Sequence, residues 1–168
     1  MKKRSLFLVT VLMVVLLSVL SVPAHAGPPE NASGGWHYRP LGLPEVKVAG
    51  GNTILTMKEE AYWEGTFDGV SEDHGTVVFY AAGHWIFQGW VEFDPVTVDG
   101  RTGSLTMRVV GSKPDASADW SGTWVIIKGT GDLKGLQGQG TWWGPGWQGD
   151  PLVYGVIPYA GNVHFEPD

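Results

Sequence analysis

The sequence predicts an all-β protein, a single eight-stranded antiparallel β-barrel, and the spacing of its glycines is the main observation. Beyond residue 64 glycines interrupt the chain repeatedly, whereas a helix needs about ten or more residues with few glycines. Short segments rich in Val and aromatic residues alternate with turn residues at near-regular intervals, which is typical of a β-sandwich or a β-barrel. A closed barrel leaves no unpaired strand edge, and we therefore predict the barrel.

The first 26 residues have the pattern of a secretory signal peptide. Lys2, Lys3 and Arg4 precede the apolar run Leu6–Leu20, and a small-x-small triplet ends at Ala26. The rival interpretation is an uncleaved transmembrane anchor, but a run of about 15 apolar residues is short for a bilayer span. We predict cleavage of residues 1–26, no membrane span in the mature chain, and an exported protein that is secreted or periplasmic.

The composition of residues 27–168 narrows the expected function. Glycine makes up about 18% of them against a usual ~7%, and eight Lys and Arg face 17 Asp and Glu, a net charge of −9. A surface that binds nucleic acid needs clustered Lys and Arg side chains to contact the phosphates, so nucleic acid is not an expected partner. The chain has no Cys, so the exported protein would fold without disulfides.

The mature chain is predicted to consist of a leader and one domain. Residues 27–51 are rich in Pro and Gly and predict an extended leader, with the barrel over 52–168. In Asn52–Glu64 apolar and polar residues alternate, with Glu59 as the exception, which favours a strand. The rival interpretation is a short helix that begins with a Thr56-x-x-Glu59 capping box.

The remaining predicted strands are separated by turn residues. Val96–Val98 and Ser104–Val110 flank Asp99-Gly100, a dipeptide suited to the positive φ values of a tight hairpin turn. The other predicted strands are Thr76–Ala82, Trp85–Phe93, Ala116–Lys128, Leu136–Trp143, Leu152–Tyr159 and Asn162–Glu166.

A Gly-Thr-aromatic pattern occurs at Gly65–Phe67, Gly122–Trp124 and Gly140–Trp142. In a strand the glycine and the aromatic residue two positions later share a face. Glycine lets the strand coil sharply and a large ring fills the space beside it, so we interpret this repeat as structural.

Several motifs that would carry chemistry are incomplete. The glycine-rich segment Gly129–Gly140 is not followed by a helix, so we expect a tight turn there and no phosphate-binding loop. Asp68, Glu72 and Asp73 are expected to cluster in a turn, without the ordered spacing of a calcium loop. No Gly-x-Ser-x-Gly elbow or Cys nucleophile is present, and we expect neither a metal nor a cofactor. The mature histidines lack paired ligand spacing: His37, His74, His84 and His164.

Two carboxylates within aromatic strands, Glu64 and Glu92, are candidate catalytic residues. A carboxylate that points into an apolar barrel would have a raised pKa and could act as a general acid or base. The alternative is that this face is the solvent side, where Glu is ordinary. Gln88 and Trp90 share a strand face with Glu92, and Tyr80 is a further companion, so these three are candidate ligand-binding residues.

The densest aromatic patch is Trp142, Trp143 and Trp147. Consecutive residues point to opposite sides of a strand, so only one of Trp142 and Trp143 can serve the core. The other covers a rim or contacts a ligand, and we include Trp143 among the candidate ligand-binding residues. Indole faces stack on sugar rings, so a carbohydrate-binding surface is one interpretation, and structural use of the tryptophans is the other.

Two stretches carry a resemblance to a known family. Gly83–Gly111 contains Phe87-Gln88-Gly89 and the turn Asp99–Leu105, and Trp124–Gly140 contains the glycine-rich run Lys128–Gly138. Together they resemble a bacterial domain-of-unknown-function family and, more distantly, the allene oxide cyclase and dirigent barrels. The resemblance covers roughly residues 54–143 and implies an eight-stranded barrel with a cavity that opens at one end. The cyclase relatives shape a reactive apolar intermediate in that cavity, and related barrels form dimers and trimers.

We therefore predict an exported barrel that binds a small apolar or amphipathic ligand without chemistry. One alternative is a cofactor-independent isomerase or cyclase that acts by confinement, with Glu64 or Glu92 buried and facing the cavity. A second alternative is a carbohydrate-binding surface module. A homo-oligomer is a further expectation, because the outer faces carry many aromatic residues.

Overall fold

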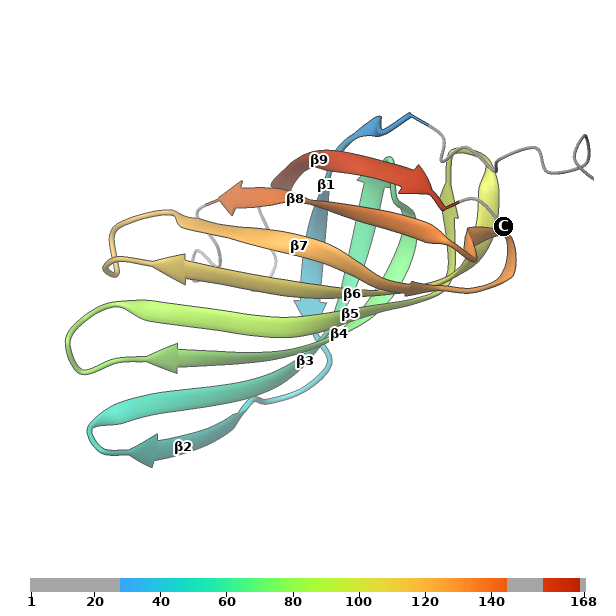
Figure 1. The fold of residues 1–168 in the computed structure, drawn as a ribbon. Helices are drawn as coiled ribbons and strands as arrows, with labels where there is room; N and C mark the ends of the chain where they lie inside the picture. The colour runs from blue at the N-terminus through green and yellow to red at the C-terminus, as the bar shows by residue number, and fades with distance from the viewer. Residues whose placement is uncertain (1–27, 145–155, 167–168) are drawn as a thin grey trace, which may run out of the picture.

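Nine antiparallel strands account for most of residues 28–144 and 156–166, the parts of the chain that this computed structural model describes (Figure 1). The strands are β1 (Glu30–Pro40), β2 (Glu45–Ala49), β3 (Asn52–Gly65), β4 (Asp68–Phe79), β5 (Trp85–Val98), β6 (Arg101–Lys113), β7 (Trp120–Gly129), β8 (Leu136–Gly144) and β9 (Ile157–Phe165). Within the described ranges the only helical element is a 3-10 turn, Gly131–Leu133. The predicted all-β fold is confirmed.

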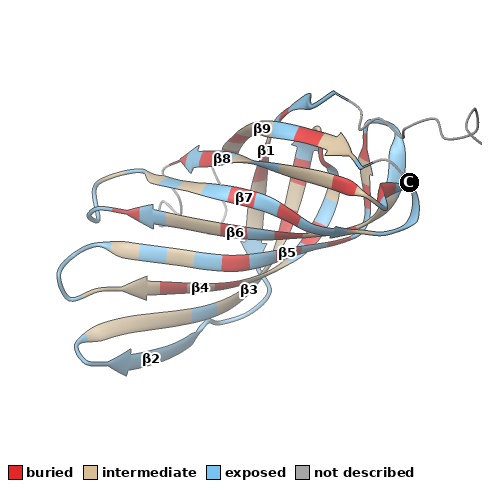
Figure 2. Cartoon of the chain, viewed as in Figure 1, coloured by how far each residue is buried: buried red, intermediate tan, exposed pale blue. Residues whose placement is uncertain are grey.

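The sheet closes through β1. Successive strands from β2 to β9 pair with one another, and β1 pairs with both β3 and β9. Residues 34–40 of β1 lie beside 59–65 of β3, and residues 30–36 lie beside 157–163 of β9. β2 pairs with β3 along residues 52–56, and all five of its residues are exposed (Figure 2). The protein is therefore a closed eight-stranded antiparallel barrel with one extra strand, β2.

The predicted leader over 27–51 is wrong for its described part, because β1 is the strand that completes the barrel. A Cβ atom at Gly34 would lie 2.0 Å from the Glu64 carbonyl oxygen and 2.6 Å from the Tyr159 hydroxyl oxygen. The glycine is needed because neighbouring strands approach so closely where the barrel closes. Gly34, which looks like a linker residue in the sequence, is thus required by the packing of a barrel strand.

Most predicted strands are confirmed. Asn52–Gly65 is a strand and not a helix, and Asp99 and Gly100 form the hairpin turn with φ values of 49° and 73°. β7 begins at Trp120, later than predicted, because the Asp115 carboxylate accepts hydrogen bonds from main-chain N–H groups in the preceding turn. Residues 157–165 form one continuous strand where two had been predicted. The predicted signal peptide and residues 152–155 lie outside the described residues.

Cross-strand pairs of glycine and tryptophan build part of the interior. Gly122 lies opposite Trp142, and Trp124 lies opposite Gly140. A Cβ atom would lie 2.4 Å from the Trp142 ring nitrogen at Gly122, and 2.5 Å from the Trp124 ring at Gly140. The Gly-Thr-aromatic repeat is therefore structural at these two positions, and the ring that covers each glycine belongs to the neighbouring strand.

Aromatic rings fill the middle of the barrel. The indoles of Trp36 and Trp63 stack with centroids 4.5 Å apart, and Phe67 meets Trp124 edge-on at 5.4 Å. The Tyr159 hydroxyl accepts a hydrogen bond from the main-chain N–H of Phe67 at 3.0 Å. Buried residues alternate with more exposed ones along the strands, so one face of each strand lines this core (Figure 2).

Candidate functional site

Glu64 and Glu92 both lie exposed on the outer face of the barrel. Of the two interpretations of these carboxylates, the solvent-facing one is correct, and the buried Glu64 or Glu92 expected for an isomerase or cyclase is wrong. Their neighbours Trp63 and Phe93 take the inward positions, with 3% and 2% of their surface exposed. Because successive side chains of a strand point to opposite faces, the two carboxylates turn toward solvent.

The candidate ligand-binding residues Gln88, Trp90 and Tyr80 do not lie together in the barrel interior. Gln88 and Trp90 share the exposed outer face of β5 with Glu92, and the Arg108 guanidinium lies 6.0 Å from the Trp90 ring centroid. Tyr80 lies in the β4–β5 turn, where its ring stacks on His84 at 4.2 Å. These residues line no common site with Glu64 in the described structure.

Trp142 and Trp143 separate as the alternation predicts. Trp142 is 5% exposed, and its ring N–H donates a hydrogen bond to the Val110 carbonyl oxygen at 3.1 Å. Trp143 is 46% exposed on the outer face. Trp142 therefore belongs to the core, and Trp143 is available at the surface. Trp147 lies outside the described residues.

The inner face of the barrel carries two carboxylates that the sequence patterns do not indicate as interior residues, Glu59 on β3 and Asp73 on β4. They are register partners, and each shares the inward face of its strand with buried residues, Ala61 and Ser71 respectively. Directly opposite residues of an antiparallel pair have Cβ atoms about 4.5–5.5 Å apart. The signal that could have identified Glu59 is its place among apolar residues in the alternation of Asn52–Glu64.

A short hydrogen-bond chain orients Asp73. The Trp63 ring N–H donates to the Ser71 hydroxyl at 2.9 Å, and that hydroxyl donates to the Asp73 carboxylate at 2.6 Å. Burial raises the pKa of Asp73 to about 7, although the hydrogen bond from Ser71 acts in the opposite direction. Burial, and secondarily the negative charge of Asp73, raise the pKa of Glu59 to about 8. The pair is therefore able to exchange protons near neutral pH.

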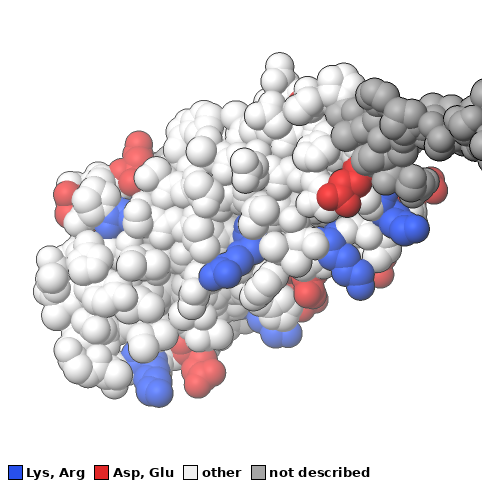
Figure 3. Space-filling view, viewed as in Figure 1, with Lys and Arg blue, Asp and Glu red and all other residues white. Residues whose placement is uncertain are grey.

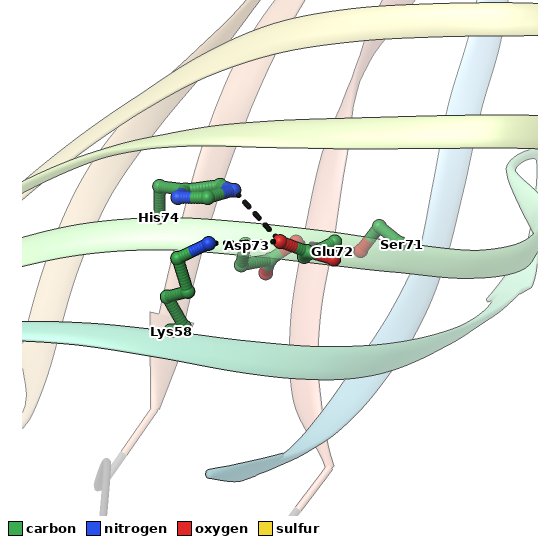
Figure 4. A network of polar contacts seen from close by, with 5 residues as sticks. All are labelled: Lys58, Ser71, Glu72, Asp73 and His74. Atoms are coloured by element: carbon green, nitrogen blue, oxygen red, sulfur yellow. Dashed lines mark hydrogen bonds and ion pairs between the residues drawn. The ribbon is translucent and has the colours of Figure 1, made fainter. Parts of the chain in front are cut away.

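A different set of charges lies on the outer side of the same strands (Figure 4). The Lys58 Nζ and His74 Nε2 atoms lie 3.4 Å and 3.1 Å from one carboxylate oxygen of Glu72. Asp68, Glu72 and Asp73 do not cluster in a turn as expected, because all three belong to β4 and Glu72 and Asp73 point to opposite faces. No group of three His, Asp or Glu side chains that could hold a metal ion occurs within residues 28–144 and 156–166.

Partly exposed aromatic rings line the inner face at one end of the barrel, which we call the mouth. Trp85 lies 4.6 Å from Phe79 and 6.2 Å from Trp120, and Phe87 lies 6.5 Å from Trp120, all between ring centroids. The Lys113 ammonium lies 4.9 Å from the Trp85 centroid, and this lysine is only 7% exposed. The mouth thus combines apolar rings with one buried cation.

The carboxylate pair is partly accessible to solvent. Within the described residues the pairing of β1 with β9 reaches Trp36, and the pairing of β1 with β3 continues to Pro40, which lies opposite Glu59. Glu59 and Asp73 are both of intermediate exposure. The two carboxylates can therefore accept hydrogen bonds from, or exchange protons with, a molecule that reaches them.

No helix in the described parts of the chain has the length and apolar character needed to cross a membrane.

Comparisons with known proteins address the family and the fold. A family model described as a protein of unknown function (DUF3224) matches residues 43–143, and no curated protein matches the chain. A crystal structure from Shewanella oneidensis MR-1, of a DUF3224 protein with unknown function, has 19% identity and a TM-score of 0.64. The match covers 84% of this chain and 100% of that chain, and at this identity it supports the fold alone. The likeness to allene oxide cyclase stays a prediction. Because the family model matches more than half of the sequence, this protein belongs to the DUF3224 family.

Proposed function

We propose that this barrel binds a small amphipathic ligand in its interior, with the polar group of the ligand at Glu59 and Asp73. The observation that carries the proposal is the pair of adjacent inward carboxylates without an ion-pair partner among the described residues. Burial of two carboxylates costs free energy that an apolar pair would avoid. Perturbed carboxylates in a partly accessible interior are typical of functional sites.

The chemistry of the interior indicates the class of ligand. The rings of Trp85, Phe87 and Trp120 offer apolar surface to an aromatic or aliphatic group. Carboxylates accept hydrogen bonds, so the polar group of the ligand should be an amine or another N–H or O–H donor. A cationic amine would also lower the pKa values of Glu59 and Asp73 on binding.

A fluorescence titration with N-phenyl-1-naphthylamine, a neutral aromatic amine, tests the proposal. We expect a saturable increase in emission and at least a tenfold weaker affinity in Asp73→Asn and Trp120→Ala. The matched outer-face variants Glu64→Gln and Trp90→Ala should bind as the wild type does. An absence of saturable, displaceable binding would contradict ligand binding in the barrel.

A second candidate is a cofactor-independent isomerase or cyclase that uses the same carboxylates. It is favoured by pKa values of about 7 for Asp73 and about 8 for Glu59. At neutral pH such a pair shares about one proton, so one group could donate a proton while the other accepts one. NMR titration of 13C-labelled carboxyl groups should show this pair titrating between about pH 6 and 9. Titration of both groups below pH 5 would exclude the acid–base pair.

Export and self-association belong to the same proposal. The sequence of residues 1–26 supports export, and the mass of the mature protein should correspond to a chain that begins at Gly27.

The exposed strand β2, with Val46 59% and Val48 70% exposed, supports a homo-oligomer. Size-exclusion chromatography with light scattering should then show more than one chain per particle, and a monomer at all concentrations would contradict it.

A further inference from the structure

The outer face of the barrel carries an open groove that runs across β1, β7, β8 and β9. It consists of two adjoining depressions of about 730 and 540 Å³, which share Val125, Gln139 and Asn162 in their lining. Ala160 keeps its floor low on β9, because its outward side chain is a single methyl group. Besides His164, the polar lining residues carry amide or hydroxyl groups: Asn31, Thr123, Gln137, Gln139, Thr141 and Asn162.

Four amide side chains form a continuous cluster in this groove. Gln139 and Asn31 both lie opposite Asn162, and Gln137 lies opposite His164 on the same pair of strands. None of these four amides makes a side-chain hydrogen bond within the described residues. Their donors and acceptors are therefore available to a ligand or to water.

The groove is lined by no permanently charged side chain, although the protein as a whole is acidic, and His164 is the one ionisable residue in its lining. No Lys, Arg, Asp or Glu lines either depression. Figure 3 shows a largely uncharged surface over β7, β8 and β9, with charged side chains mainly around it. An ionic ligand would find no counter-charge here, whereas a neutral polar ligand would not need one.

An exposed indole extends the row of groove residues on β8. Gln137, Gln139, Thr141 and Trp143 follow one another on the outer face, since residues two apart in a strand share a face. Trp143 is 46% exposed, and the row from Gln137 to Trp143 is roughly 20 Å long at about 3.3 Å per residue. The row therefore offers hydrogen-bonding groups along its length and a flat apolar ring at one end.

We propose that this groove binds a neutral oligosaccharide or the neutral glycan of a polysaccharide. Each sugar hydroxyl is both donor and acceptor, and an amide offers two donors and one acceptor in the same plane. The C–H face of a pyranose ring is apolar and stacks on the exposed indole of Trp143. A second copy of this chain fits less well, because homodimer interfaces are more apolar than this amide-rich lining. The proposal is independent of ligand binding inside the barrel.

The experiment uses protein expressed from the full chain and titrated calorimetrically with cellohexaose, chitohexaose and maltohexaose. We expect binding to at least one of them at micromolar to millimolar concentrations. Gln139→Ala and Trp143→Ala should each weaken that binding at least tenfold. Gln88→Ala and Trp90→Ala are the matched controls on the outer face of β5, and Trp90 is 44% exposed. Both controls should bind as the wild type does.

Three results would overturn the proposal. One is the absence of binding to all three hexasaccharides at millimolar concentration by folded protein, as verified by circular dichroism. Another is binding that the groove variants leave unchanged while the β5 variants weaken it. If Gln139→Ala and Trp143→Ala dissociate an oligomer in sedimentation velocity without affecting sugar binding, the groove is an interface between copies and the glycan site is refuted.

Discussion

Replacement of Glu59 by Gln should make the protein more stable at alkaline pH. Burial raises the pKa of Glu59 from 4.5 to about 8 and that of Asp73 from 3.8 to about 7, so the native state retains protons that the unfolded state releases. The stabilisation is complete below the unfolded pKa values and is lost as pH rises through the folded ones. The free energy of unfolding should therefore fall between about pH 4.5 and 8, by at most about 1.4 kcal/mol per pH unit for each group.

The magnitude follows from the pKa of Glu59 in the native state. The difference between 4.5 and about 8 corresponds to about 5 kcal/mol if it is fully expressed. The side chain is partly accessible, and solvent screening reduces this figure, so we expect about 2 kcal/mol. Gln has the shape of the protonated carboxyl group, and Glu59→Gln should thus equal the wild type near pH 4.5 and exceed it by about 2 kcal/mol at pH 9.

Urea unfolding followed by tryptophan fluorescence measures the difference at intervals from pH 4.5 to 9. Glu64→Gln, on the outer face of the same strand, is the matched control and should follow the wild type throughout. The reasoning is refuted if Glu59→Gln has the same pH dependence as the wild type, or if it is less stable than the wild type at pH 9.

Three further substitutions test the packing and the hydrogen bonds. Gly122→Ala should lose about 1–3 kcal/mol in urea unfolding, because its Cβ atom would lie 2.1 Å from a carbonyl oxygen, whereas Gly42→Ala, with open space around it, should be neutral. Tyr159→Phe should lose about 1–3 kcal/mol, since a buried main-chain N–H loses its acceptor, and a loss below about 0.5 kcal/mol would count against that role. Ser71→Ala should raise the pKa of Asp73 above about 7 in a 13C NMR titration, because the hydrogen bond from the hydroxyl holds it down, and a fall would contradict this.

Local chemistry made much of the fold predictable. Asp99-Gly100 specified a hairpin through backbone angles that glycine adopts easily, and the spacing of glycines excluded long helices. The closing strand was not predictable in this way, because the reason for Gly34 is a contact with residues 30 and 125 positions further along the chain, Glu64 and Tyr159. Composition alone could not distinguish a glycine required by barrel closure from one in a linker.

The strict alternation of side chains along a strand is enough to predict which face of the barrel each of these carboxylates occupies. In β5, Phe87, Val91 and Phe93 are the more apolar set, which assigns Glu92 to the solvent side, as the structure shows. In β3 the same rule places Glu59 with Ala61 on the inner side. The alternation therefore gives the direction of each carboxylate. It could not give their pairing, since the register of Glu59 with Asp73 depends on the β3–β4 hairpin.

The groove and the aromatic core share one wall of the barrel but depend on opposite faces of it. In β8, Gly140 faces inward beneath the Trp124 ring, while Gln139 and Thr141 face the outer groove. A Cβ atom at Gly140 would also lie 2.1 Å from the Ala160 carbonyl oxygen of β9. A larger residue there would displace the strands and disturb both the core and the groove, whereas Gln139→Ala changes the groove surface alone. Surface variants are therefore the ones that separate glycan binding from the integrity of the barrel.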